Sequence, residues 1–101
     1  MVQVIENLAR LTGHILSCSS HPRIADFDLI EMKLDSNQEV EGLPNLIANV
    51  QGDVLELSVR RELLGSNPIG ASISCRAKVT PNGVMCEPHP AADNFSISSA
   101  F

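Results

Sequence analysis

Aromatic side chains are scarce in this sequence. It contains no tryptophan, no tyrosine and only three phenylalanines, at positions 27, 95 and 101. Its hydrophobic fraction of 44% therefore comes almost entirely from Ile, Leu, Val and Ala, which predicts an aliphatic core. Because proteins usually bind single-stranded nucleic acids through aromatic side chains that stack on the bases, this scarcity disfavours a nucleic-acid binding role.

Long apolar runs and an excess of positive charge are also missing. No segment reaches the roughly 20 apolar residues of a membrane helix, and the start, MVQVIENLAR, lacks the basic and apolar blocks of an export signal. Seven Lys and Arg stand against twelve Asp and Glu, a formal net charge of -5, which disfavours attraction to phosphate backbones or anionic lipid. Cys18, Cys75 and Cys86 are an odd number of cysteines. We therefore expect a small acidic cytoplasmic protein with reduced thiols and no membrane partner.

Complete catalytic and cofactor motifs are absent from the sequence. The six glycines are scattered, so there is no phosphate-binding loop, and no serine lies in a Gly-x-Ser-x-Gly motif. Asp26 and Asp28 flank Phe27 as a pair of carboxylates, but no His, Lys or metal motif accompanies them, and an exposed acidic strand edge is the simpler interpretation. Cys18 lies near His21 without a third residue to orient the histidine. The sequence thus predicts no enzyme, no catalytic residue and no cofactor.

The start of the chain carries a helical spacing of apolar residues. They recur at three- and four-residue steps, at Val4, Ile5, Leu8 and Leu11. This spacing predicts a short amphipathic helix within residues 1–12, which Gly13 ends. Because the helix has only about three turns, it must dock on the rest of the domain, where it would plug one end of a barrel, or on a partner.

Alternation of apolar and polar residues then predicts five strands. We expect them within residues 14–20, 27–34, 54–63, 69–79 and 84–86. The polar segment 35–44 and the cluster 65–68 predict loops, and Pro81-Asn82-Gly83 predicts a tight hairpin. Beyond residue 87, prolines and weak alternation leave two interpretations open, an extended tail that lies on the barrel and a disordered tail.

Three strands, a break and a two-strand hairpin form the order found in the OB-fold, a five-stranded Greek-key barrel. The chain resembles that architecture over about residues 14–87, with Gly52-Asp53 opening a long strand, Gly70 in the fourth strand and the hairpin at residues 81–83. The stretch between the third and fourth strands is too short for the helix often found there. An SH3-like barrel or another five- to six-stranded roll fits almost as well.

The expected fold is therefore mainly β, a small five- to six-stranded OB-like (Greek-key) barrel with a short N-terminal helix. A chain of 101 residues is expected to form a single domain. Within it we expect the helix at residues 1–12, the β-barrel at residues 13–87 and a C-terminal extension at residues 88–101.

A Cys-x-x-His-Pro pattern occurs twice, at residues 18–22 and 86–90. Two thiolates and two imidazoles suit tetrahedral zinc, and the ends of the first and fifth strands can share one rim of a barrel. The residues of this hypothetical structural zinc site are Cys18, His21, Cys86 and His89. However, residues three apart on a strand point to opposite faces, so two buried thiols and two rim histidines are the alternative. The sequence leaves both interpretations open, and we assign no metal ligand.

Positive charge concentrates in the third and fourth predicted strands. Arg60, Arg76 and Lys78 would form a basic stripe if those strands were neighbours, which is the basis for a second alternative, an OB-like single-stranded nucleic-acid binder. Such residues are more often the solvated face of alternating strands, and the net charge disfavours this role.

By elimination, the sequence predicts a non-catalytic binding or accessory module that makes protein–protein contacts. The candidate contact surfaces are the acidic stretch 26–41, the apolar stripe of the predicted helix and the tail that ends in Phe101. The sequence does not identify the partner. Self-association through a strand edge or through the helix stripe stays open.

Overall fold

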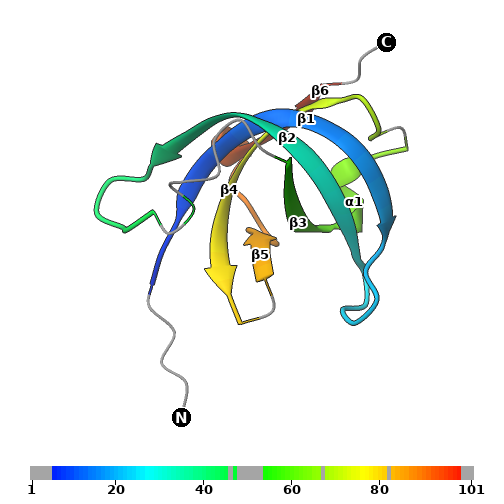
Figure 1. Ribbon diagram of the computed structural model, residues 1–101, viewed down its shortest axis with the longest axis horizontal. Helices are drawn as coiled ribbons and strands as arrows, with labels where there is room; N and C mark the ends of the chain where they lie inside the picture. The colour runs from blue at the N-terminus through cyan, green and yellow to red at the C-terminus, as the bar shows by residue number, and fades with distance from the viewer. Residues whose placement is uncertain (1–5, 46, 48–53, 67, 82, 99–101) are drawn as a thin grey trace.

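Most of the chain is β-strand wound into a barrel (Figure 1). The computed structural model describes residues 6–45, 47, 54–66, 68–81 and 83–98. The barrel strands are β1 (Ala9–Ser20), β2 (Phe27–Glu39), β3 (Val54–Arg60), β4 (Ser72–Thr80) and β5 (Gly83–Cys86). A short helix, α1 (Arg61–Leu64), follows β3, while a 3-10 turn, η1 (Ala92–Asn94), precedes the additional strand β6 (Phe95–Ser98). The prediction of a mainly β barrel is confirmed.

The strand order closes the barrel. It runs β1-β2-β3-β5-β4, and β4 pairs in turn with β1. All these pairings are antiparallel except that of β3 with β5, which run parallel where Ser58 pairs with Met85. Strand β6 pairs with the first half of β4, and β5 pairs with the second half. One strand, β4, therefore has neighbours from both ends of the chain.

Alternate side chains of each strand fill the interior. On β2, Ile30, Met32 and Leu34 are buried, whereas Glu31 and Lys33 between them are exposed. This is the two-residue period from which the strands were predicted. Other fully buried side chains are Leu11, Ile15, Leu57, Val59 and Cys75. The core is aliphatic, as the composition indicates.

The predicted N-terminal helix is wrong over the residues that the structure describes. Residues 6–8 have no regular secondary structure, and β1 begins at Ala9. Over so short a run, helical spacing and alternation are hard to separate, and Ala9, Leu11 and Ile15 also fit a two-residue period. Gly13 does not end a helix but lies within β1, beside a register shift in its pairing with β2. Residues 1–5 of the predicted helix lie outside the described residues.

Several strand boundaries differ from the prediction. The segment 35–39, expected in a loop, continues β2 and pairs with the start of β1, because polar residues can extend a strand whose side chains face solvent. The third strand stops at Arg60, since residues 61–64 turn into α1. The C-terminal extension lies on the barrel over residues 95–98, where Phe95 and Ile97 pack against the core. No helix in the described part of the chain is long and apolar enough to cross a membrane.

Candidate functional site

The strand registers align charged side chains on the outer face of the barrel. Arg10 of β1 lies opposite Arg76 of β4. The pairing of β4 with β5 continues past β5, so Glu87 lies opposite Arg76 and donates its amide N–H to the Arg76 carbonyl at 3.1 Å. Arg60, the last residue of β3, contacts the two residues after Glu87. We call these residues the arginine row: Arg10, Arg76 and Arg60, with Glu87 beside Arg76.

Arg76 and Glu87 form a two-pronged ion pair. The Nε and Nη2 atoms of Arg76 donate to Oε1 and Oε2 of Glu87 at 2.6 and 2.7 Å. Such a parallel pair of bonds is the strongest arrangement of these two groups. The hydrogen bonds to Glu87 raise the pKa of the Arg76 guanidinium. The side chain of Arg76 is 24% exposed and that of Glu87 is 26% exposed, so the pair is only partly shielded from water.

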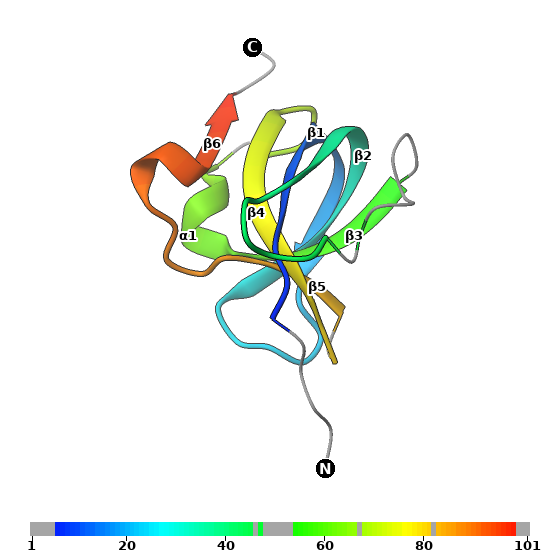
Figure 2. The same ribbon diagram turned by 90° about the vertical axis from the view of Figure 1, so that its left-hand side faces the viewer.

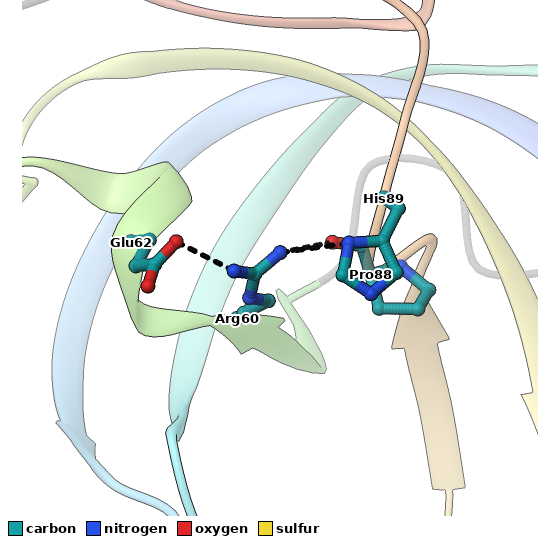
Figure 3. A network of polar contacts seen from close by, with 4 residues as sticks. All are labelled: Arg60, Glu62, Pro88 and His89. Atoms are coloured by element: carbon teal, nitrogen blue, oxygen red, sulfur yellow. Dashed lines mark hydrogen bonds and ion pairs between the residues drawn. The ribbon is translucent and has the colours of Figure 1, made fainter.

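Arg60 holds Pro88 and His89, the two residues that follow Glu87 (Figure 3). Its Nη1 donates to the Pro88 carbonyl at 3.2 Å and lies 2.8 Å from Nδ1 of His89, while Nη2 donates to the carboxylate of Glu62. Because a guanidinium can only donate, Nδ1 of His89 accepts and the ring proton of the neutral imidazole is at Nε2. This contact therefore fixes the tautomer of His89 in the folded chain.

The segment between β5 and β6 thus lies across the outer face as a strap, residues 87–94. Its far end is held by Arg10, which donates to Oδ1 of Asn94 at 3.1 Å. Figure 2 shows this segment leaving β5 and passing α1 on its way to β6. Three arginines from three different strands hold the strap: Arg10 of β1, Arg76 of β4 and Arg60 of β3.

A cavity of about 420 Å³ lies beside the strap. It is lined by Glu6, Asn7, Leu8, Leu43, Lys78, Glu87, Pro88 and His89. The amide of Asn7, which is buried, bonds twice to the backbone of Val79, with Nδ2 donating to the carbonyl at 3.0 Å and Oδ1 accepting from N–H at 2.7 Å. The N–H of Leu8 donates to the carbonyl of Pro44 at 3.1 Å. These contacts fix the segment before β1, so the cavity is formed before any ligand arrives.

The lining combines apolar walls with a charged rim. Leu8, Leu43 and Pro88 supply the apolar surface, and Glu6 and Lys78 supply charge. In the part of the chain that the structure describes, Lys78 makes no ion pair. Such a cavity suits an apolar side chain that lies next to a charged group.

The site has to be interpreted from its own residues. Comparisons of the chain with protein-family models, with curated proteins and with solved structures found no match. The charge distribution is the most informative property. Four of the seven Lys and Arg of the chain surround the strap and the cavity: Arg10, Arg60, Arg76 and Lys78.

The structure brings the predicted basic residues to one side of the barrel but not as a free stripe. Arg60 is paired with Glu62, and Arg76 is paired with Glu87. Of these three predicted basic residues, Lys78 alone has no acidic partner among the described residues. The sequence reasoning missed Arg10, Asn7 and Glu87. Alternation along a strand fixes which face a side chain takes, but the residue opposite depends on register, and that is a long-range property.

The repeated Cys-x-x-His-Pro pattern does not form a ligand set. Among the described residues, no three His, Cys, Asp or Glu side chains are grouped so that they could hold a metal ion. In the first copy, the Cys18 thiol donates to Asp28 at 3.6 Å, and Nδ1 of His21 accepts the backbone N–H groups of Arg23 and Ile24 at 3.0 Å. The histidine of this copy therefore stabilises the turn between β1 and β2.

The second copy is divided between the interior and the strap. Cys86 is buried in the core, where its thiol contacts that of Cys75, whereas His89 is exposed and contacts Arg60. Cys86 and His89 therefore point to different environments. All three cysteines of the chain are free thiols.

The remaining sequence candidates are dispersed. Asp28 receives a hydrogen bond from Arg61 at 2.9 Å, and Asp26 lies in the preceding turn with a positive φ of 66°. Strand β2 pairs with β1 and β3, so the interpretation of this segment as an acidic strand edge is wrong. Of the predicted helix stripe, Leu8 and Leu11 are buried and offer no exposed stripe. Phe101 lies outside the described residues.

The buried thiol pair predicts a loss of stability at alkaline pH. The contact with Cys86 and burial raise the pKa of Cys75 well above the ordinary 9.0. The folded chain therefore retains a proton that the unfolded chain releases, so this contribution is complete below pH 9 and decreases as the pH rises above it. The urea concentration at the unfolding midpoint should therefore decrease when the pH is raised from 8 to 10, since these two pH values bracket the ordinary cysteine pKa of 9.0.

Substitution of Cys75 by alanine should flatten this pH dependence, whatever it costs in packing at neutral pH. The matched control is Cys18→Ala, which removes a half-exposed thiol and should leave most of the dependence in place. The chain has no tyrosine to titrate in the same range. An equally steep dependence in the Cys75 variant would contradict the assignment.

Proposed function

We propose that the chain is a non-catalytic, OB-like binding module that contacts another protein through the cavity beside the strap. The observation that carries this proposal is a concave site with apolar walls whose backbone is already fixed by hydrogen bonds. Pre-organisation of this kind lowers the entropy cost of binding. The three free thiols support a reducing, cytoplasm-like compartment.

The OB-like assignment rests on connectivity. Strands β1, β2 and β3 are successive neighbours, and β4 returns to lie beside β1, which supports a Greek-key assignment. The parallel contact of β3 with β5 closes the five-stranded barrel and supports the OB-like assignment. The short α1 occupies the connection between β3 and β4, where a longer helix is common in this architecture.

The charge on the outer face favours a protein over a polynucleotide as the partner. OB-like barrels bind oligonucleotides on the face of strands two and three. On this chain, Glu31 of β2 lies directly opposite Glu56 of β3, and both are exposed. A phosphate backbone on this face would approach two carboxylates, which repel it. The residues 60, 76 and 78 do not compensate, because two of the three already have acidic partners.

Affinity capture with paired variants tests the proposal. Leu43→Arg places a long charged side chain in the cavity wall and should abolish capture of a partner that the wild-type chain retains from native extract. Leu16→Arg makes the same change on the outer face of β1, where Leu16 is 49% exposed and does not line the cavity, and should retain the partner. Capture that is unaffected by Leu43→Arg, or lost equally in both variants, would refute the cavity as the contact site.

A further inference from the structure

We propose that the arginine row is a carboxylate-binding surface that the strap occupies through Glu87, and that an acidic segment of the protein partner binds there by displacing the Glu87 carboxylate. This inference rests on the proposed protein-binding function and names the chemistry of the partner. Glu87 lines the cavity as well, so the two surfaces are continuous.

The contact between Arg76 and Glu87 already has the geometry of a carboxylate bound by a guanidinium. Both oxygens of Glu87 accept hydrogen bonds from Arg76, at 2.6 and 2.7 Å. The fork of a guanidinium is matched to a carboxylate or a phosphate, and here the group that fills it is a carboxylate of the same chain. A glutamate or aspartate of another chain presents the same two oxygens and can replace it atom for atom.

Glu87 does not neutralise all the positive charge on this face of the barrel. Arg10 lies opposite Arg76, so two guanidiniums are neighbours on the same face, and the strap offers Arg10 only the neutral amide oxygen of Asn94. Lys78, two residues along β4 from Arg76, makes no ion pair with any described residue. The row can therefore accept more negative charge than Glu87 supplies. On a chain of net charge -5, this cluster of positive charge attracts an acidic segment.

The strap is attached to the barrel only weakly. Every residue from 87 to 94 is exposed or half-exposed, so the strap buries no side chain in the core. Polar contacts hold it, and partly exposed ion pairs contribute little to stability. Beyond it, Phe95 and Ile97 of β6 pack on the core and keep the far end anchored. The strap can thus leave the row while the barrel stays folded.

An acidic protein segment fits these observations better than nucleic acid. The residues of the row and of the cavity lining include no phenylalanine, tyrosine or tryptophan on which a base could stack. The group that already binds is a carboxylate, and the neighbouring face carries Glu31 and Glu56. Binding of an oligonucleotide is the outcome that would reassign the row.

The test is fluorescence anisotropy with a fluorescein-labelled hexaglutamate peptide at low salt. Glu87→Gln removes the internal carboxylate and should tighten binding about three- to fivefold relative to wild type, the size expected for release of one exposed ion pair. Glu41→Gln gives the same net charge from an exposed turn residue that is not among those lining the cavity, and it should bind like wild type. The double variant Arg76→Gln, Glu87→Gln should lose the gain. Added salt should weaken binding in all of them.

Three outcomes would overturn the inference. Glu87→Gln and Glu41→Gln could tighten binding equally, which would mark a non-specific effect of net charge. Hexaglutamate could fail to bind either variant. A labelled oligothymidylate could bind Glu87→Gln more tightly than hexaglutamate does, which would assign the row to nucleic acid. None of these results affects the capture experiment with Leu43→Arg, so the failure of this inference and the failure of the proposed function are distinguishable.

Discussion

Replacement of Gly13 by alanine is expected to lower the free energy of unfolding by about 3 kcal/mol or more, although it adds a single methyl group. A Cβ atom at this position would lie 2.1 Å from the carbonyl oxygen of Lys33 and 2.8 Å from the Cε of Met32. The Met32 side chain can move, but the Lys33 carbonyl is backbone. Strand β2 would have to shift where its pairing with β1 is already irregular. The close approach of two strands, and not an unusual φ, makes glycine necessary here.

Urea unfolding followed by circular dichroism measures this effect, and Gly42→Ala is the matched control. Gly42 has a φ of +85° but nothing within 4 Å of an added Cβ, so only conformational strain of about 1 kcal/mol is expected. A Gly13 variant no less stable than the Gly42 variant would mean that the two strands do not approach as closely as described.

Replacement of Asn7 by alanine is expected to cost about 2–3 kcal/mol. The substitution removes both hydrogen bonds to Val79 and leaves the N–H and the carbonyl of a partly buried residue without these partners. Because a lost partner costs more than a bond gains on formation, the penalty exceeds that for a solvent-exposed bond. The segment before β1 should then move, and the cavity that it lines should lose its shape.

Amide exchange at Val79 is the most direct measurement, since the side chain of Asn7 protects that N–H. Exchange there should accelerate in the variant, and the urea midpoint should fall. Asn94→Ala is the control, because it removes a half-exposed bond to Arg10 and should change stability by less than about 1 kcal/mol. An unchanged exchange rate at Val79 would contradict the hydrogen bond between its N–H and the side chain of Asn7.

The sequence predicts the strands and turns that depend on residues close together in the chain. Ile30, Met32 and Leu34 alternate with charged residues, and the strand that they predict is present with the expected face inward. The turn at residues 81–83 predicts the hairpin of β4 and β5, and these strands pair as expected. Five such strands suffice to predict a barrel.

The sequence does not reveal what depends on pairing between distant segments. Leu8 and Leu11 fit a helix locally, but Leu11 lies in β1 and pairs with Cys75 of β4, more than sixty residues away. For the same reason the sequence does not predict the arginine row. Alternation along each strand places Arg10 and Arg76 on the outer face, but it does not show that they lie opposite each other. His21 and His89 share a motif, yet the backbone after each residue differs, so one closes a turn and the other lies on the strap.

The position of β4 has a consequence for synthesis on the ribosome. Its partners are β1 from the start of the chain and β5 and β6 from the end. While the chain emerges, β1, β2 and β3 can pair only as an open three-stranded sheet with two unpaired edges. The gap is closed only once β4 and β5 have left the exit tunnel, so the nascent chain is most vulnerable to association with its neighbours until these two strands have emerged.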